Sequence, residues 1–457
     1  MTSDETIMKV FGAYDIRGVY PDALNEEITY KAARALVVYL DARAVAVGRD
    51  MRLSSPALAE AALRGIADQG AQAIDLGMTS TDELYFAVGK FGYPAGIMIT
   101  ASHNPGQYNG LKMCREEAIP LSDKSGLEDI RDSILQNDFP TPAQTFPIQK
   151  VDVLDAFVEH ALGFVDIGKI RPMKIVADAG NGMAGMVLPR VFAKIPQCEL
   201  IPLYFELDGH FPHHPASPIE PENMEDLQRA AQSHSADIGV AFDGDADRMF
   251  ITDENANLID GATVTAMVAT SMLRKHPGST ILYNLISSRD VPEAIERAGG
   301  KAVRTRVGHS FIKPQMRSEN AIFGGEHSGH FYFRDNFYAD SGLIAFLHVL
   351  ELLSEEHKTV SELAAPFHTR FSSGEINTRF ESQSAVKAKV QEIVQTYERQ
   401  PGASVDMLDG VTVNFSDWWF NVRGSNTEPF LRLNVEGDTA VRMEHGRDEV
   451  LAVIRAK

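Results

Sequence analysis

The feature that most constrains the fold is an order of elements that occurs three times. Each copy reads as a strand, a glycine-marked loop, a helix and a second strand, with strand pairs at 44–47 and 73–76, 174–177 and 199–204, and 280–284 and 302–306. In the second copy the glycine-rich loop is 178–185 and the helix is 186–194. Parallel strands joined through a helix are the building unit of α/β sheets. The sequence therefore predicts three related α/β domains in tandem, with mixed sheets.

The composition changes after Pro366. Segments 371–380, 410–415 and 419–422 have the alternation and the β-branched or aromatic content of antiparallel strands, and 384–397 and the residues from Thr439 read as helices. A chain of 457 residues is too long for a single core, and proline-rich seams divide it. We expect domains at 1–145, 146–251, 252–367 and 368–457, the last a smaller α+β domain.

Charge and hydropathy limit the possible partners and location. The net charge of −20, from 43 basic and 63 acidic residues, argues against nucleic acid or an anionic membrane as a partner. We find no apolar run long enough for a membrane span and no secretory signal, and the 2 cysteines fit a reducing compartment. These features predict a cytoplasmic protein.

Residues 100–105, Thr-Ala-Ser-His-Asn-Pro, follow the apolar strand 95–99. The residue before a proline is pushed out of the α region, so Asn104-Pro105 prevents a helix from starting here. Ser102 then lies on a tight loop at a strand end, where open α/β sheets bind ligands. Its hydroxyl is a candidate nucleophile or phosphate carrier; a plain strand-capping turn is the alternative.

A second loop, Asp-Gly-Asp-Ala-Asp-Arg at 243–248, follows the apolar strand 238–242. Alternating Asp243, Asp245 and Asp247 bring three hard oxygen ligands to one centre, which suits Mg²⁺. The same spacing opens a calcium-binding EF-hand loop. We reject calcium because Arg248 stands where that loop needs glycine, and because both flanks read as strands.

Two further loops carry polar side chains. In Gly-Glu-His-Ser-Gly-His at 325–330, Glu326, Ser328 and His330 alternate and suit hydrogen bonding to sugar hydroxyls. The segment 423–429, Arg-Gly-Ser-Asn-Thr-Glu-Pro, has the composition of an oxyanion or phosphate cradle. The alternative is a glycine-rich turn with incidental polar side chains for the first loop, and a β-turn for the second.

Taken together and in this order, the motifs YDIRG, TASHNP, YNGLK, DGDADR, VGHSFIK, GEHSGHFYF and RGSNTEP make the chain resemble the α-D-phosphohexomutase family over essentially its whole length. The resemblance is closest to the bacterial phosphomannomutase/phosphoglucomutase members. It implies four domains around a central cleft and a protein that is a monomer or a weak dimer.

The resemblance also implies a role for each matching residue. Ser102 would be a phosphoserine, and Asp243, Asp245 and Asp247 would hold Mg²⁺ together with an oxygen on Ser102. The implied catalytic residues are Ser102, Lys112, His330 and Arg248. The implied substrate-binding residues are Tyr14, Arg17, His309, Glu326, Ser328, Arg423, Ser425, Asn426 and Thr427.

The implied reaction moves a phosphoryl group between the 1- and 6-positions of a hexose phosphate through a hexose 1,6-bisphosphate, which also serves as activator. Segments 330–335 and 338–342 resemble the mannose type, whereas His327 matches neither the glucosamine nor the mannose enzymes. We expect a phosphomannomutase with some glucose activity. The alternatives are a phosphoglucosamine mutase or phosphoglucomutase, a metal-dependent sugar phosphatase, and a sugar-phosphate sensor without turnover.

Overall fold

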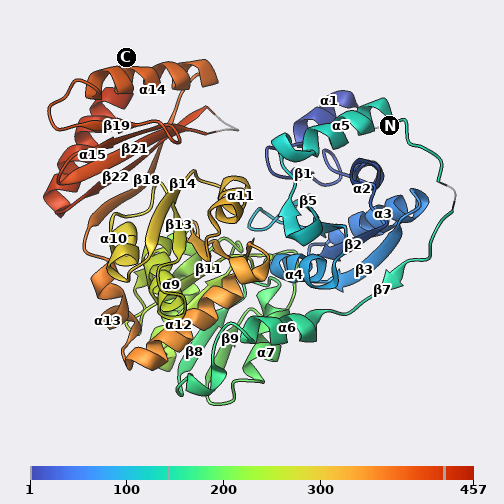
Figure 1. Ribbon diagram of the computed structural model, residues 1–457, viewed down its shortest axis with the longest axis horizontal. Coiled ribbons are helices and arrows are strands. Elements are labelled where there is room, and N and C mark those ends of the chain that lie inside the picture. Colours follow the sequence, from blue (N-terminus) through green and yellow to red (C-terminus); the bar gives the residue numbers. More distant parts are fainter. Residues whose placement is uncertain (1–2, 143, 426–428, 457) are drawn as a thin grey trace.

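The computed structural model describes residues 3–142, 144–425 and 429–456. Its described strands form four sheets that follow one another along the chain. Figure 1 shows the N-terminal sheet (blue) and the C-terminal sheet (red) on opposite sides of the molecule, with the second and third sheets between them. The expected series of three α/β domains and one C-terminal α+β domain is confirmed.

The first sheet has the strand order β1-β5-β4-β2-β3-β7, with β6 beside β5. Its strands are β1 (Ile16–Val19), β2 (Ala44–Arg49), β3 (Gln72–Met78), β4 (Ala95–Ile99), β5 (Tyr108–Arg115), β6 (Ile119–Pro120) and β7 (Gln149–Lys150). The helices are α1 (Asp4–Val10), α2 (Glu26–Leu40), α3 (Ser55–Asp68), α4 (Thr81–Phe91) and α5 (Leu127–Gln136).

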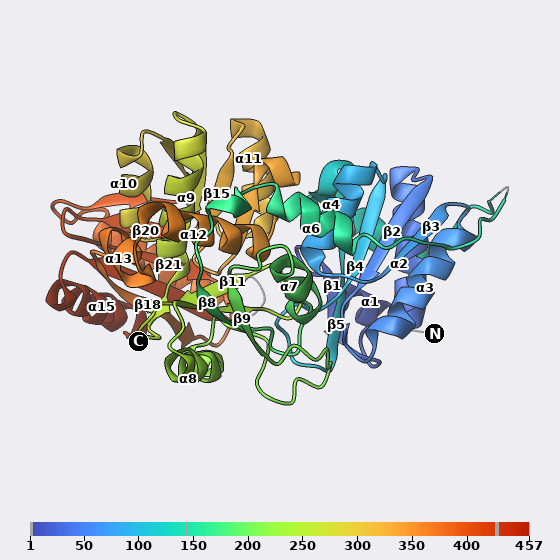
Figure 2. The same cartoon turned by 90° about the horizontal axis from the view of Figure 1, so that it is seen from below.

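The second sheet has the order β12-β11-β10-β8-β9. Its strands are β8 (Lys174–Asp178), β9 (Glu199–Leu203), β10 (Ile238–Phe242), β11 (Met249–Thr252) and β12 (Leu258–Ile259), and its helices are α6 (Leu154–Leu162), α7 (Ala184–Phe192) and α8 (Glu225–His234). In Figure 2, α6 lies between α4 of the first domain and α12 (Gly342–Glu356) of the third, and it contacts both.

The third sheet has the order β14-β13-β15-β16-β17. Its strands are β13 (Thr280–Asn284), β14 (Lys301–Thr305), β15 (Phe323–Gly325), β16 (Phe331–Phe333) and β17 (Ala339–Asp340). Its helices are α9 (Gly261–Lys275), α10 (Asp290–Arg297), α11 (His309–Glu319), α12 (Gly342–Glu356) and α13 (Val360–Ala364).

The three α/β sheets share one pattern of pairing. In each sheet, three adjacent strands are parallel, in the orders β3-β2-β4, β9-β8-β10 and β14-β13-β15. The last strand of each set then pairs with an antiparallel neighbour, which is β5, β11 or β16. The mixed sheets that we expected are therefore present in all three domains.

The C-terminal sheet is antiparallel, with the order β18-β22-β21-β20-β19. Its strands are β18 (Phe371–Arg379), β19 (Ser404–Asp406), β20 (Val411–Asn414), β21 (Trp418–Gly424) and β22 (Phe430–Gly437), and its helices are α14 (Gln383–Tyr397) and α15 (Ala440–Arg455). This domain has a core of its own, built on residues such as Trp418, Phe420 and Ile393.

The second and third domains share one continuous hydrophobic core. Phe242 of β10 and Phe346 of α12 meet edge to face with their ring centroids 6.3 Å apart. Phe86 of α4 belongs to the same buried cluster, so the first domain is also attached to it. Because interiors are close-packed, this core holds the loops of different domains at fixed positions relative to one another.

One helix begins earlier than expected. We predicted a glycine-rich loop through Gly185, but α7 already begins at Ala184. A Cβ at Gly185 would lie 2.2 Å from the carbonyl oxygen of Phe205, so this glycine serves a close backbone approach and not a turn.

No helix among the described residues has the length and hydropathy needed to cross a membrane. The predicted domain boundaries and the central cleft stay predictions.

Candidate active site

Three of the loops singled out in the sequence occupy equivalent positions in the three α/β sheets. The loop with Ser102 joins β4 to β5, the aspartate loop 243–248 joins β10 to β11, and the loop 326–330 joins β15 to β16. Each therefore connects the last parallel strand to its antiparallel neighbour. An isolated backbone bridge between Arg248 and His330 connects the second loop directly to the third.

Ser102 lies in the interior of this arrangement, with only 3% of its surface exposed. Its hydroxyl donates to Asp243 Oδ2 at 2.7 Å and accepts from Arg248 Nη2 at 2.8 Å. The backbone of Ser102 is left-handed, with φ of 51°. A non-glycine residue adopts this conformation rarely. Here the conformation directs the hydroxyl of Ser102, a residue of the first domain, towards the aspartate loop of the second domain.

Asp243, Asp245 and Asp247 are each at most 1% exposed, and one oxygen from each lies within 4.8 Å of the others. Two cations oppose them. Lys112 Nζ, on β5, lies 2.7 Å from Asp245 Oδ2 and 2.6 Å from Asp247 Oδ2. Arg248 Nε lies 2.9 Å from Asp243 Oδ2. Three buried carboxylates thus face two neighbouring side-chain cations.

This imbalance affects the pKa values of the carboxylates. Burial raises the pKa of Asp243, and burial together with the charge of Asp245 raises that of Asp247 well above its usual value. Burial acts in the same direction on Asp245, but Lys112 outweighs it and holds the pKa of that carboxyl below its usual value. An added cation would relieve this repulsion.

The aspartate loop fits a metal ion. Oδ1 of Asp245 and Oδ1 of Asp247 are buried and have no hydrogen-bond partner among the described residues. Buried polar atoms are normally paired, so unpartnered carboxylate oxygens among like charges are what a bound cation would satisfy. Hard oxygen donors of this kind suit a divalent cation such as Mg²⁺.

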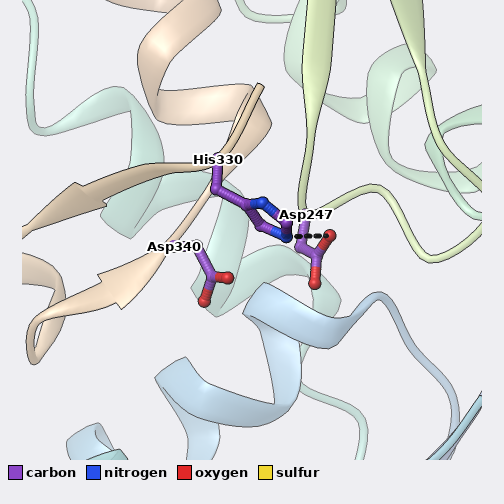
Figure 3. A group of neighbouring side chains, drawn as sticks. All are labelled: Asp247, His330 and Asp340. Atoms are coloured by element: carbon purple, nitrogen blue, oxygen red, sulfur yellow. Dashed lines mark ion pairs between the residues drawn. The ribbon is translucent and has the colours of Figure 1, made fainter. Parts of the chain in front are cut away.

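His330 lies beside the aspartate loop. Figure 3 shows its ring directed towards Asp247, with Asp340 of β17 nearby. His330 Nε2 is 3.8 Å from Asp247 Oδ1, and its Nδ1 is 3.2 Å from the hydroxyl of Ser328. Lys313 Nζ binds Asp340 at 2.6 Å in the interior, so this second carboxylate already has a cation.

Glu326 is turned into the protein. It is 1% exposed, and it accepts hydrogen bonds from the backbone N–H of Gly308 at 2.8 Å and from the hydroxyl of Tyr332 at 2.7 Å. Burial raises its pKa. The contacts of Glu326 and of half-buried Ser328 with a sugar stay a prediction.

Two residues of the N-terminal motif make long-range contacts, one with the Ser102 loop and one with the third domain. Arg17 Nη1 donates to Asn104 Oδ1 at 2.5 Å, next to the Ser102 loop. Tyr14 reaches the third domain, where its ring meets Phe311 of α11 edge to face at 6.4 Å. His309 is the first residue of α11, and its side chain lies outside the described part of the structure.

The C-terminal loop belongs to the fourth sheet and begins at the end of β21. Arg423 Nη2 lies 3.0 Å from Glu375 Oε2, and Arg432 Nη1 lies 3.4 Å from Oε1 of the same carboxylate. The backbone N–H of Ser425 donates to the carbonyl of Phe430 at 2.9 Å. Asn426 and Thr427 lie outside the described residues. Burial, then the charge of Arg423, lowers the pKa of His327 to about 4.

Sequence reasoning missed two residues that contact this centre. Thr81, the first residue of α4, donates its hydroxyl to Asp245 Oδ2 at 2.6 Å. His103 contacts Arg248, whose charge, together with burial, lowers the pKa of His103 to about 2 and keeps the ring neutral. His103 stands inside the serine motif, which was a usable signal. Thr81 carried none, because only the tertiary fold brings it to the aspartate loop.

Comparison with known families accounts for nearly the whole chain. Four successive models match: Phosphoglucomutase/phosphomannomutase, alpha/beta/alpha domain I at residues 8–141, domain II at 155–257 and domain III at 260–371, and the C-terminal domain at 375–453.

Individual relatives match over their full length. A phosphomannomutase of Escherichia coli is 40% identical over 98% of this chain and 100% of its own. The phosphohexose mutases of Xanthomonas campestris pv. campestris are 40% identical over 98% and 99%. Among solved structures, a phosphoglucomutase/phosphomannomutase family protein from Burkholderia thailandensis has a TM-score of 0.89 at 30% identity, covering 100% of this chain and 98% of that one.

The position of Lys112 generates a prediction. Lys112→Met keeps the length of the side chain but leaves Asp245 and Asp247 without their shared cation, so the free energy of unfolding should fall by about 3 kcal/mol. Urea unfolding measures this change, and added Mg²⁺ should recover part of it. Lys124→Met, at an exposed position of the same domain, is the control. Equal stability of the two variants would contradict the neutralising role of Lys112.

Proposed function

Because the chain belongs to the phosphoglucomutase/phosphomannomutase family, we propose that it is a phosphomannomutase that interconverts mannose 1-phosphate and mannose 6-phosphate. The observation that carries the proposal is the Ser102 hydroxyl, hydrogen-bonded to both Asp243 and Arg248 within a buried cluster of carboxylates. It is supported by the similarity over the full length to proteins named phosphomannomutase.

In the proposed reaction Ser102 carries the phosphoryl group. Phosphoserine transfers it to the free hydroxyl of the hexose monophosphate, which gives a hexose 1,6-bisphosphate. The bisphosphate reorients in the site and returns its other phosphoryl group to Ser102, so no phosphate is released. Free hexose 1,6-bisphosphate would act as activator by phosphorylating Ser102. Arg248 donates to the Ser102 oxygen at 2.8 Å, which suits stabilisation of charge on that atom during transfer.

Mg²⁺ is the proposed metal, held by Asp243, Asp245, Asp247 and an oxygen on Ser102. When bound, it would neutralise charge on the transferring phosphoryl group. The Oδ1 atoms of Asp245 and Asp247, which have no hydrogen-bond partner among the described residues, support this ligand set.

Proton transfer needs a base for the attacking hydroxyl and an acid for the departing serine oxygen. Lys112 and His330 are the proposed pair, because both lie near Asp247. Lys112 Nζ, from the first domain, is 2.6 Å from Asp247 Oδ2, and His330 Nε2, from the third domain, is 3.8 Å from Asp247 Oδ1. The shared carboxylate links the protonation of the two groups.

The proposed substrate contacts surround this centre. We assign the sugar and its phosphate to Tyr14, Arg17, His309, Glu326, Ser328, Arg423, Ser425, Asn426 and Thr427. The buried Nε–H groups of Arg17 and Arg423 lack a hydrogen-bond partner among the described residues, which supports an anion as their ligand. Glucose phosphates are a second proposed substrate, supported by the relatives named phosphohexose mutases.

The first prediction tests the phosphate carrier. Ser102→Ala removes the only proposed phosphoryl acceptor, so kcat should fall by roughly 10³-fold or more. A coupled assay with mannose 1-phosphate, Mg²⁺ and trace bisphosphate measures turnover, and intact mass measures the phosphorylated form. Exposed Ser233→Ala is the control. Release of free phosphate would identify a phosphatase instead, and binding without turnover would identify a sensor. Fully active protein without a phosphorylated form would contradict the proposed carrier.

A second prediction concerns the metal. Asp245→Asn replaces a charged ligand with a neutral one, and activity and Mg²⁺ affinity should fall by roughly 100-fold or more. Calorimetry and a Mg²⁺ titration of activity measure the two effects. Exposed Asp155→Asn in the same domain should change neither. Wild-type activity that persists in excess EDTA would rule out the metal requirement.

A third prediction separates the C-terminal loop from the chemistry. Arg423→Ala removes a charge-assisted phosphate contact worth about 2–4 kcal/mol. The KM for mannose 1-phosphate and glucose 1-phosphate should therefore rise by roughly 30-fold or more, while Mg²⁺ affinity stays unchanged. Exposed Arg399→Ala, two residues after α14, is the control. An unchanged KM with lost Mg²⁺ binding would place this loop in the catalytic centre.

A further inference from the structure

A fully buried arginine lies behind the Ser102 loop. Arg52, in the connection between β2 and α3, has 0% of its surface exposed. Its five guanidinium N–H groups face five acceptors: Asp50 Oδ2 at 3.1 Å from Nε, the carbonyls of Pro105 at 2.8 Å and Tyr108 at 3.0 Å from Nη1, and those of Ser102 at 2.7 Å and Asn104 at 2.6 Å from Nη2. The guanidinium is therefore saturated by the protein alone.

All four carbonyls belong to residues 102–108, the segment that carries the proposed phosphate acceptor. Ser102 itself has a left-handed backbone, with φ of 51°. Such a conformation in a residue with a side chain persists only when its surroundings over-determine it. One of those surroundings is Arg52, which holds the carbonyl of Ser102. Another is Gly244 of the aspartate loop, where an added Cβ would lie 2.5 Å from the same oxygen.

The charge of Arg52 is balanced locally. Asp50, also 0% exposed, stands two residues before it and accepts from its backbone N–H at 3.0 Å as well as from its side chain. The second domain covers the other side, where the Phe211 ring centroid lies 5.2 Å from the guanidinium carbon. The position of Arg52 is thus fixed, and its hydrogen bonds restrain the backbone of residues 102–108.

We propose that Arg52 is a positioning residue for phosphoryl transfer. By fixing the carbonyl of Ser102 it aims the hydroxyl at Asp243, without touching the substrate. The inference rests on the proposed function, because it assigns Arg52 to that reaction. Lysine cannot replace it, since an ammonium has three donors and no planar fork with which to hold four carbonyls and a carboxylate.

The test is Arg52→Lys, which retains a cation beside Asp50. We expect a folded protein whose kcat and rate of Ser102 phosphorylation by mannose 1,6-bisphosphate both fall roughly 30- to 100-fold, the size of effect that a small misplacement of a reacting group produces. The KM for mannose 1-phosphate should stay within about twofold, because no substrate contact is lost. Amide hydrogen exchange should become faster in residues 100–108.

A purely stabilising role predicts a different result. The melting temperature would fall, while kcat per folded molecule and the phosphorylation rate stayed within about threefold of wild type, and this outcome would overturn the proposal. Arg64→Lys, exposed on α3, is the matched control and should match wild type in every measurement. If Arg52→Lys does not fold, the double variant Asp50→Asn/Arg52→Gln, which leaves no buried charge at these two positions, is judged by the same criteria. Failure of both to fold would assign Arg52 to stability and reject the positioning role.

The same experiment distinguishes failure of this inference from failure of the proposed phosphomannomutase activity. If the wild-type protein neither takes up phosphate on Ser102 nor converts mannose 1-phosphate, the proposed function fails. Hydrogen exchange in residues 100–108 then still decides whether Arg52 holds the loop, because that measurement needs no turnover. Active wild-type protein with unchanged rates in Arg52→Lys would instead reject the positioning role alone.

Discussion

The buried charges around Asp245 are the constraint on which the rest of the structure depends. Three carboxylates from one short loop are removed from water, and neither their burial nor their mutual repulsion is favourable. The protein offsets this with Lys112 from the first domain and Arg248 from the second, at distances between 2.6 and 2.9 Å. Because Lys112 must come from another domain, the cluster requires the first two domains to be docked, and docking brings the Ser102 hydroxyl to Asp243.

Repetition of one topology explains how loops so distant in sequence converge. Parallel strands end at the same edge of a sheet, and the loop between the last parallel strand and its antiparallel neighbour leaves from that edge. The chain places a serine loop, an aspartate loop and a Glu-Ser-His loop at this one position in three successive sheets. The core shared by the second and third domains and the bridge between Arg248 and His330 then hold the loops together.

The sequence predicted the features that depend on local order. Strand 280–284 and the start of strand 371–380 coincide with β13 and β18, because alternation and glycine positions are local signals. It did not predict that α7 begins at Ala184, since Gly185 is required by the backbone of Phe205. Nor did it indicate Thr81 or Arg52, whose partners lie elsewhere in the chain. The inward turn of Glu326 towards Tyr332 likewise follows from packing, which alternation along a loop does not reveal.

The protein must recognise an anionic substrate although its own net charge is −20. The arginines that we assign to the substrate are each paired with a carboxylate of the protein. Arg17 is paired with Asp15 and Arg423 with Glu375, so neither presents a bare positive charge to solvent. Each nevertheless retains a buried Nε–H without a partner among the described residues. A phosphate can accept a hydrogen bond from such a donor. The carboxylate of Asp15 or Glu375 already fixes the orientation of the guanidinium, which lowers the entropic cost of ordering the arginine on binding. In the proposed function, selectivity for a phosphorylated sugar rests on these preorganised donors. Acidic residues elsewhere on the protein oppose binding little, because screening limits their reach to about 8 Å at physiological ionic strength.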